Sequence, residues 1–155
     1  MQPKTTNQYS DVVTQDLPDL MPIEMACHSH PWSDKTFKSC IGGRYFGEKL
    51  TVENTVVGFY VGEFVIDEAT LMDICVTPSE QGNGYGKALL NQFMAKAKSQ
   101  GAVKIFLEVR SKNISAQMLY MNAGFIETGR RTAYYPSASG FGYEDAIVMR
   151  KDIGR

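Results

Sequence analysis

SEQGNGYGKALL, residues 79–90, places three glycines at alternate positions directly before a run of good helix formers. Thr77-Pro78 ends a strand-like segment just upstream, so the glycines lie between a strand and a helix. A helix N-terminus preceded by residues without Cβ presents unpaired N–H donors and the positive end of the helix dipole. Together these favour an anion such as a pyrophosphate, and the stretch predicts a phosphate-binding turn.

Spacing decides which phosphate-binding motif this is. A Walker loop requires glycine at 81 and serine or threonine at 88, where this chain has Gln81 and Ala88. A Rossmann turn requires glycine or alanine where Lys87 or Leu89 stands. Both motifs are excluded, and an ordinary glycine-rich turn is the structural alternative that remains.

Composition and charge narrow the class of protein. The chain has 155 residues, enough for one domain (1–155) with a core of its own. Sixteen basic and 17 acidic residues leave a net charge of -1, which is not typical of a nucleic-acid binder. Three well-separated cysteines form no disulfide or zinc-knuckle pattern, and no apolar run is long enough to span a bilayer. We expect a cytoplasmic protein with no membrane contact and no direct nucleic-acid contact.

Hydrophobic periodicity predicts the elements on both sides of the glycines. Asp16 is expected to cap a helix that ends around HSHPWS, and Ser33 a short helix that stops at Gly42-Gly43. Asn113 is expected to cap a helix that ends at Gly124. The other predicted elements are strands at 44–52, 55–66 and 69–76 with turns at 53–54 and 67–68, a helix from 87 to 101, and strands at 103–109, 125–134 and 143–151.

This order predicts a mixed α/β fold with a largely antiparallel central sheet interrupted by one β-α-β unit. The unit contains the glycines, and its second strand alternates: Val103, Ile105, Leu107 and Val109 share one face, and Glu108 lies on the other.

The pattern that fits the turn is Q-x-x-G-x-G, at Gln81, Gly84 and Gly86, and with it the sequence resembles the GNAT acyl-CoA N-acetyltransferases. The resemblance narrows to the bacterial RimI-type branch, which acetylates the N-terminal alanine of a small-subunit ribosomal protein. The sequence departs from that branch at Gly82, where a larger polar residue is frequent, and in the loop at 137–143, which is slightly longer than usual. The resemblance is carried along almost the whole chain by DLPDL, HPWS, DEATLMDICV, LEVRSKN, LYMNAGF, RRTAYYP and YEDAIVM.

The resemblance implies a GNAT fold, acetyl-CoA as cosubstrate and direct transfer to a ribosomal protein N-terminus. Backbone groups of two splayed strands would bind the pantetheine arm, and the glycine loop would bind the pyrophosphate. Asn113 is assigned a coenzyme contact, beside its role as a helix cap. The residues implied for the coenzyme are Ile74, Cys75, Val76, Gln81, Gly82, Asn83, Gly84, Tyr85, Gly86, Lys87 and Asn113.

Two residues are candidates for proton transfer. Glu108 is the expected general base, since the family also places a carboxylate there, and its structural alternative is a carboxylate paired with Arg110. Tyr120 is the expected general acid toward the departing thiolate, and its alternative is a core tyrosine with its hydroxyl at the surface. An acetylated Cys75 is less favoured, because a cysteine within an apolar strand is usually a small core residue.

The sequence indicates fewer residues for the binding of the acceptor amine than for the coenzyme. Trp32 is expected to pack near the acceptor groove with His28 or His30, and Tyr134 and Tyr135 either line the groove or pack on the core. Cys27, His28 and His30 resemble metal ligands, but no fourth ligand is evident, so no metal is predicted.

The acceptor amine itself is compatible with a modest base. Freeing an α-amine at pH 7 costs about 1 kcal/mol, against about 4.6 kcal/mol for a lysine side chain. This difference leaves open an acetyltransferase for a small amine or a protein lysine, and a module that binds acetyl-CoA without catalysis.

Overall fold

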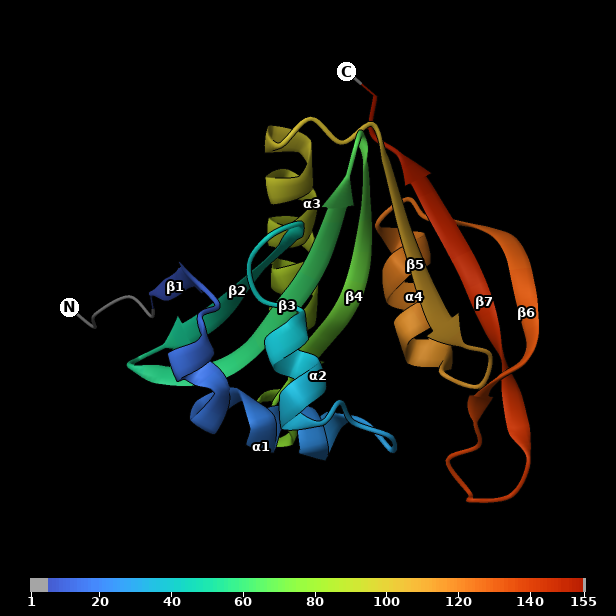
Figure 1. Ribbon diagram of the computed structural model, residues 1–155, viewed down its shortest axis with the longest axis horizontal. Coiled ribbons are helices and arrows are strands. Elements are labelled where there is room, and N and C mark those ends of the chain that lie inside the picture. The colour runs from blue at the N-terminus through green and yellow to red at the C-terminus, as the bar shows by residue number, and fades with distance from the viewer. Residues whose placement is uncertain (1–5, 155) are drawn as a thin grey trace.

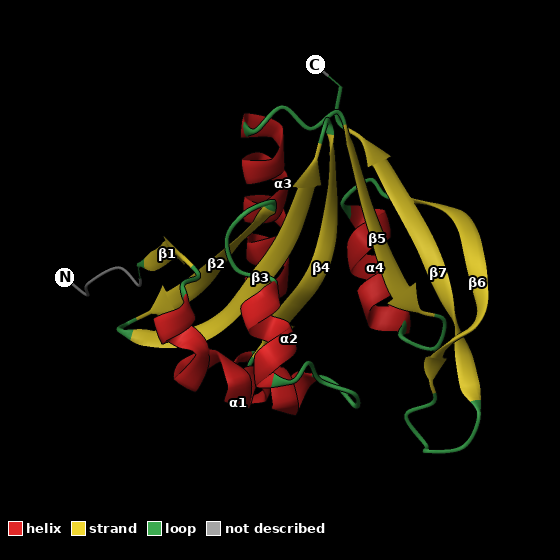
Figure 2. Cartoon of the chain, viewed as in Figure 1, coloured by secondary structure: helices red, strands yellow, loops and turns green. Residues whose placement is uncertain are grey.

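The computed structural model describes residues 6–154, and in these a seven-stranded sheet runs in the order β1-β2-β3-β4-β5-β7-β6. Every neighbouring pair is antiparallel except β4 and β5, as the mixed α/β prediction requires (Figures 1 and 2). The strands are β1 (Asn7–Asp11), β2 (Tyr45–Val52), β3 (Thr55–Val65), β4 (Glu68–Val76), β5 (Lys104–Arg110), β6 (Ile126–Pro136) and β7 (Tyr143–Asp152). The helices are α1 (Leu17–Cys27), α2 (Asp34–Ser39), α3 (Tyr85–Ser99) and α4 (Ile114–Asn122), with 3-10 turns η1 (Thr14–Asp16) and η2 (Pro78–Glu80).

Helices cover both faces of the sheet. Figure 1 shows α1 and α2 in front of β3 and β4, with α3 behind them. Phe37 of α2 packs on Phe59 of β3, their ring centroids 5.3 Å apart, in the core on the α1 side. Phe93 of α3 packs on Tyr60 at 5.7 Å, in the larger core on the α3 and α4 side. The alternation of Phe59 and Tyr60 therefore divides β3 between two cores.

A bulge at Met72 changes which face of β4 each side chain occupies. Val61 of β3 pairs with Asp73, but the next residue, Gly62, pairs with Leu71, so Met72 has no partner on β3. Leu71 packs in the core on the α3 side, whereas Cys75 packs in the core on the α1 side, although both have odd numbers. An extra residue in one strand produces this inversion.

Most expected boundaries are confirmed within one or two residues. The β2–β3 turn has Glu53 and Asn54 at φ 51° and 66°, the conformation of a type I′ hairpin. Ser33 accepts a hydrogen bond from the Thr36 N–H at 3.1 Å, and Asn113 accepts one from the Ala116 N–H at 3.2 Å, so both predicted caps are present. Helix α3 begins at Tyr85, two residues before the predicted start.

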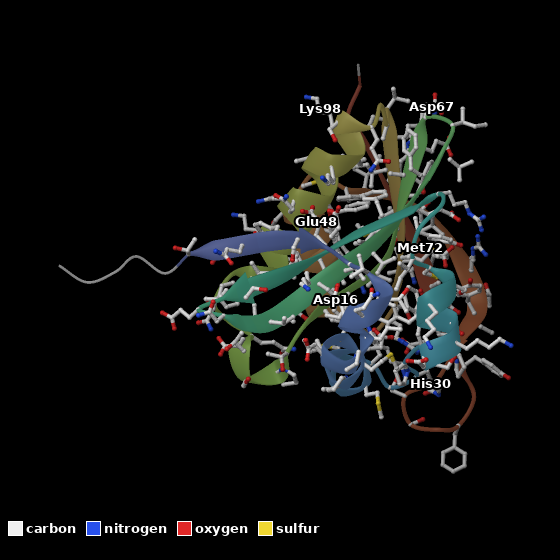
Figure 3. All side chains as sticks on the ribbon, turned by 60° about the vertical axis from the view of Figure 1, so that its left-hand side comes forward. Asp16, His30, Glu48, Asp67, Met72 and Lys98 are labelled. Carbon is white, nitrogen blue, oxygen red and sulfur yellow. The ribbon has the colours of Figure 1, made fainter. Side chains whose placement is uncertain are left out.

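The start of the chain differs from expectation. Strand β1 was not among the predicted elements, and it forms because Asn7–Asp11 pair with Glu48–Val52 of β2. Asp16 does not cap α1 through its side chain; that side chain accepts from the Val13 N–H and pairs with Lys49 of β2. Asp16 and Glu48 lie on opposite faces of the sheet, and Glu48 bonds Gln92 of α3 (Figure 3).

One chain reversal also differs from expectation. The turn between β3 and β4 falls on Ile66 and Asp67, and Glu68 already belongs to β4. Ile66 has φ 62°, an unusual conformation for a β-branched residue, and it is 89% exposed. Helix α1 ends at Cys27, directly before HSHPWS, as predicted. No helix within residues 6–154 is long and apolar enough to cross a membrane.

Candidate active site

A cavity of about 620 Å³ opens where β4 and β5 part. The two strands pair from Glu68 with Lys104 to Leu71 with Leu107, and beyond these residues they have no register partners on each other. Figure 1 shows them joined at one end and diverging toward the other. The lining includes Trp32 from the α1 side and Leu119 from the α4 side. The cavity therefore passes through the sheet from one face to the other.

The glycine-rich turn presents a row of free N–H groups to this cavity. Gly82 and Gly84 have φ 86° and 82°, a conformation that favours glycine, and Gly84 is the residue before α3. Ala88 N–H bonds to Gly84 O at 3.0 Å, but the N–H groups of residues 82–87 have no hydrogen-bond acceptor within the described chain. No side chain caps α3. The turn is therefore open to an anionic ligand.

The main chain of β4 offers groups on the opened edge. Thr77 N–H bonds to Val57 O of β3 at 2.8 Å, and an antiparallel ladder alternates, so Cys75 also directs its main-chain groups toward β3, opposite Phe59. Ile74 and Val76 then direct theirs toward the opening. Val76 O already accepts from Gln81 Nε2 and Cys27 Sγ, each at 3.1 Å. Of the three expected strand residues, Ile74 and Val76 can present main-chain groups to a ligand.

Glu108 and Tyr120 both line the cavity. Glu108 follows Leu107, the last residue of β5 that pairs with β4, and its side chain is 24% exposed. It forms an ion pair with Arg131 of β6 at 2.9 Å rather than with Arg110. Tyr120 is 6% exposed, with its ring against Phe125 at 6.1 Å, and its hydroxyl bonds no other described residue. Burial raises the pKa of Tyr120 well above its usual value, so the phenol stays protonated near neutrality.

The α1 side of the cavity holds a cluster of polar side chains: Glu24, His28, Asp73 and Cys75. Burial, with the charge of Asp73 added, raises the pKa of Glu24 to about 8. Burial disfavours the charged form of His28, but hydrogen bonding to Asp73 and the charges of Asp73, Glu24 and Cys27 together outweigh it and raise the pKa of His28 to about 9. Burial would raise the pKa of Asp73, but hydrogen bonds from His28, Glu24 and Cys75, with the charge of His28, together hold it below its usual value. An Asp73–His28 ion pair thus lies beside a neutral Glu24.

The thiol of Cys75 in this cluster and the nearby thiol of Cys27 have pKa values shifted in opposite directions. Burial and the neighbouring Cys27 raise the pKa of Cys75, which disfavours its thiolate and hence a covalent acetyl-cysteine. Hydrogen bonding with Cys75 lowers the pKa of Cys27 to about 7.

Aromatic residues border the cavity on its α1 side and beside β6. Trp32 packs edge-on against Phe37, with ring centroids 5.4 Å apart, and its main-chain N–H donates to Glu24 Oε2 at 2.8 Å. Tyr135 lines the cavity under the guanidinium of Arg110, 4.5 Å from its ring centroid, and burial raises the pKa of Tyr135 to about 12. Tyr134 is 47% exposed and absent from the lining, so the two tyrosines do not share one role.

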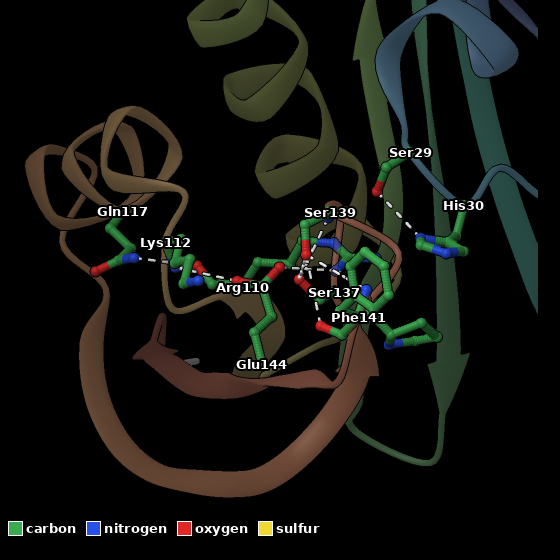
Figure 4. A network of polar contacts seen from close by, with 10 residues as sticks. Ser29, His30, Arg110, Lys112, Gln117, Ser137, Ser139, Phe141 and Glu144 are labelled. Atoms are coloured by element: carbon green, nitrogen blue, oxygen red, sulfur yellow. Dashed lines mark hydrogen bonds and ion pairs between the residues drawn. The ribbon is translucent and has the colours of Figure 1, made fainter.

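Arg110 is held by a network at the end of β5 (Figure 4). Its Nη1 donates to Glu144 Oε1 at 2.8 Å and to Pro136 O at 2.7 Å. The second oxygen of Glu144 accepts from the Lys112 N–H at 3.3 Å. In the exposed loop that follows Pro136, the hydroxyl oxygens of Ser137 and Ser139 lie 3.0 Å apart, within hydrogen-bond distance. Glu144 therefore joins β7 to the strand that carries Glu108.

Most residues expected from the sequence lie together around this cavity, but some do not. Asn83, Lys87 and Tyr134 are outside the lining; Asn83 instead bonds Glu80 O at 3.2 Å. Two residues of the lining, Glu24 and Asp73, were not predicted as site residues, since a single carboxylate on a helix or strand gives no sequence pattern that marks a site. The expected residues on the lining are Trp32, Ile74, Cys75, Val76, Gln81, Gly82, Gly84, Tyr85, Gly86, Glu108, Asn113, Tyr120 and Tyr135.

A sheet opened between its two parallel strands, beside a glycine-rich helix start with free N–H groups, defines the acyl-CoA-dependent N-acetyltransferase class. The chain belongs to the acetyltransferase (GNAT) family, whose model matches residues 17–125.

Relatives within the family are more specific. The chain is 42% identical to a [ribosomal protein bS18]-alanine N-acetyltransferase of Salmonella typhimurium over 95% of this chain and 98% of that one. The crystal structure of the ribosomal-protein-S18-alanine N-acetyltransferase from Escherichia coli matches with a TM-score of 0.91 and 40% identity, over 97% of this chain and 96% of that one. A putative streptothricin acetyltransferase from Bacillus anthracis, in complex with acetyl coenzyme A, shares the fold at 19% identity and a TM-score of 0.77, over 96% of this chain and 99% of that one.

Replacing Glu144 should lower stability by an amount that depends on pH. Burial would raise the pKa of Glu144, but hydrogen bonds from Arg110 and the Lys112 N–H, with the charges of these two residues, together hold it below its usual 4.5; its contribution is complete above that pH and is lost as the pH falls through the lower folded value. Glu144→Gln should lower the free energy of unfolding by about 1 kcal/mol at pH 7, with a smaller loss below pH 4.5. Urea denaturation over that range measures this.

Glu127→Gln is the matched control, because Glu127 pairs with Arg130 at 3.4 Å on the surface with 47% of its side chain exposed. Its effect should be small at every pH. An equal loss for Glu144→Gln at pH 7 and at pH 3 would contradict the role given to the ionised carboxylate.

Proposed function

We propose that this protein transfers the acetyl group of acetyl-CoA to the N-terminal α-amine of an alanine, that of ribosomal protein bS18, by direct transfer in the cytoplasm. The observation that carries the proposal is the row of free N–H groups at residues 82–87, next to the opening between β4 and β5. The acceptor is supported by the relative from Salmonella typhimurium, named for that reaction and 42% identical over 95% of this chain.

The coenzyme fits the side of the cavity that the glycines border. Its pyrophosphate would accept hydrogen bonds from the N–H groups of residues 82–87 at the positive end of α3. Its pantetheine arm would lie along β4 as an added strand, toward which Ile74 and Val76 direct their main-chain groups. Gln81 would support this arrangement, since its amide holds Val76 O at 3.1 Å.

Gly86→Ala tests the pyrophosphate contact without disturbing the fold. A Cβ at Gly86 would meet only Leu119 Cδ2, at 3.9 Å, and the residue lies inside α3, so the protein itself has room for alanine. We expect unchanged or slightly higher thermal stability. We also expect acetyl-CoA binding to weaken about 10–100-fold by calorimetry, because a methyl group keeps the anion from hydrogen bonds to the main chain.

Gly129→Ala is the matched control. It lies on β6, no atom comes within 4 Å of the added Cβ, and it is outside the cavity lining. Its coenzyme affinity should equal that of the wild type. Unchanged affinity in Gly86→Ala would place the pyrophosphate elsewhere.

Acetyl transfer to an amine requires a neutral amine and a proton for the departing thiolate. Glu108 would accept the proton of the amine, directly or through water, from its position beside the opening. Tyr120 would donate to the thiolate, since its buried phenol keeps its proton near neutrality. An α-amine is the easier acceptor, because freeing it at pH 7 costs about 1 kcal/mol, against about 4.6 kcal/mol for lysine.

Tyr120→Phe should separate catalysis from binding. Removing only the hydroxyl from a residue that bonds no other described group should leave the fold and the coenzyme affinity nearly unchanged. Turnover should fall about 100-fold, the smaller end of what a positioned acid contributes. Glu108→Gln should act similarly, whereas Tyr143→Phe, at a tyrosine 68% exposed outside the cavity lining, should have no effect. Full turnover in Tyr120→Phe would remove this residue from the mechanism.

The acceptor is tested with a panel of substrates at a fixed acetyl-CoA concentration. Peptides with the N-terminal sequence of bS18 should be acetylated much faster than the same peptides with a blocked α-amine, a free lysine or a polyamine. Preference for the lysine or the polyamine would assign a different acceptor. Tight acetyl-CoA binding with no transfer to any substrate would indicate a non-catalytic module.

A further inference from the structure

Four side chains with metal-binding atoms meet between α1 and β4. Glu24 lies on α1 and His28 directly follows that helix, four positions later, while Asp73 and Cys75 lie on one face of β4 beyond the Met72 bulge. Their donor atoms, one from each residue, all lie within 4.8 Å of one another. The sequence suggests Cys27 and His30 as partners of His28 and no further ligand, because Asp73 and Cys75 are 45 and 47 positions away from His28.

The contacts of this cluster converge on one nitrogen. His28 Nε2 lies 2.8 Å from Asp73 Oδ1, 3.1 Å from Cys75 Sγ and 3.6 Å from Glu24 Oε1. A nucleophilic triad would instead place the carboxylate and the thiol on opposite nitrogens of the imidazole. A single ring N–H cannot serve three partners at once. Four such atoms gathered within 4.8 Å of one another can instead surround a bound cation, each as one ligand.

One carboxylate oxygen in the cluster has no hydrogen-bond donor among the described groups apart from Glu24. Asp73 Oδ2 is buried, and the side chain of Asp73 is 4% exposed. A buried polar atom left unpaired costs about 1–3 kcal/mol, more when it is charged. The neutral Glu24 beside it, 2% exposed, shares a hydrogen bond with Asp73. The proton of Glu24 is the one that a bound cation would replace.

We propose that Glu24, His28, Asp73 and Cys75 form a tetrahedral binding site for a zinc-like divalent cation. Ligand distances of about 2.0–2.1 Å for N and O and about 2.3 Å for S place neighbouring donors about 3.3–3.6 Å apart around tetrahedral zinc. The five donor separations that involve His28 or Cys75 are 2.8, 3.1, 3.4, 3.4 and 3.6 Å, within a few tenths of an ångström of these values, and the sixth, between Glu24 and Asp73, is at most 4.8 Å.

The donor set selects among cations. Metal binding would release the protons of Cys75, His28 and Glu24, so affinity should rise with pH. The resulting thiolate and imidazole favour zinc and its softer neighbours, whereas magnesium and calcium require a shell of oxygens. A cation here joins α1 to β4 at the acceptor side of the cavity. The site does not depend on the proposed function, because metal binding is measured without any acetyl transfer.

The test uses the full, reduced and metal-free chain titrated with Co²⁺ and then with Zn²⁺. Co²⁺ should bind with a thiolate charge-transfer band and the intense visible bands of tetrahedral coordination, and Zn²⁺ should displace it. A chromogenic chelator in competition measures the Zn²⁺ affinity. Zn²⁺ should also raise the thermal midpoint, since it binds the folded state. Absence of saturable Zn²⁺ binding overturns the proposal.

Variants identify the ligands. Cys75→Ala should abolish the charge-transfer band, and His28→Asn and Asp73→Asn should each weaken Zn²⁺ binding at least about 100-fold, since loss of outer partners alone costs about 10–100-fold. The controls are Cys40→Ser, a buried thiol directly after α2, and His30→Asn, an exposed imidazole of the same loop as His28; both should bind like the wild type.

Folding of each variant is checked by circular dichroism and by acetyl-CoA affinity. The Cys27→Ala variant should retain the charge-transfer band, because Cys27 bonds Val76 O and lies outside the four-donor set. A band that survives Cys75→Ala, or that disappears with Cys27→Ala instead, overturns the assignment.

Discussion

The unpaired residue Met72 sets the geometry on which the site depends. Pairing between β4 and β5 stops at Leu71, the residue just before it, and the cavity opens beyond that point. The same extra residue turns Asp73 and Cys75 toward α1, whereas Leu71 faces the core on the other side. A bulge bends its strand and redirects the side chains that follow. One inserted residue thus parts the sheet and delivers polar groups to the opening.

Charged groups around the opening are held in pairs between different strands. Arg131 of β6 binds Glu108 of β5, and Glu144 of β7 binds Arg110 at the end of β5. Each pair fixes a side chain that lines the cavity to the β6–β7 hairpin, of which β7 is the neighbour of β5. The hairpin β6–β7 therefore determines where the charges of β5 lie, although the coenzyme side is built from β4 and α3.

The sequence predicted the elements well and the contacts between them less well. Glycine spacing, helix caps at Ser33 and Asn113 and the alternation of β5 are local signals, and the structure confirms each of them. The Met72 bulge was not predicted, because hydrophobic alternation indicates two faces but not the point where they exchange. The partner of Glu108 was also missed, since Arg131 and Arg110 are equally plausible until the pairing of β5, β7 and β6 is known.

The cavity between β4 and β5 takes its walls from both faces of the sheet. Glu24 and Cys27 of α1 line it on one face, and Leu119 and Tyr120 of α4 line it on the other. A ligand bound there would therefore contact two helices that pack on opposite sides of the same sheet. Residues far apart in the sequence thus meet around a single space.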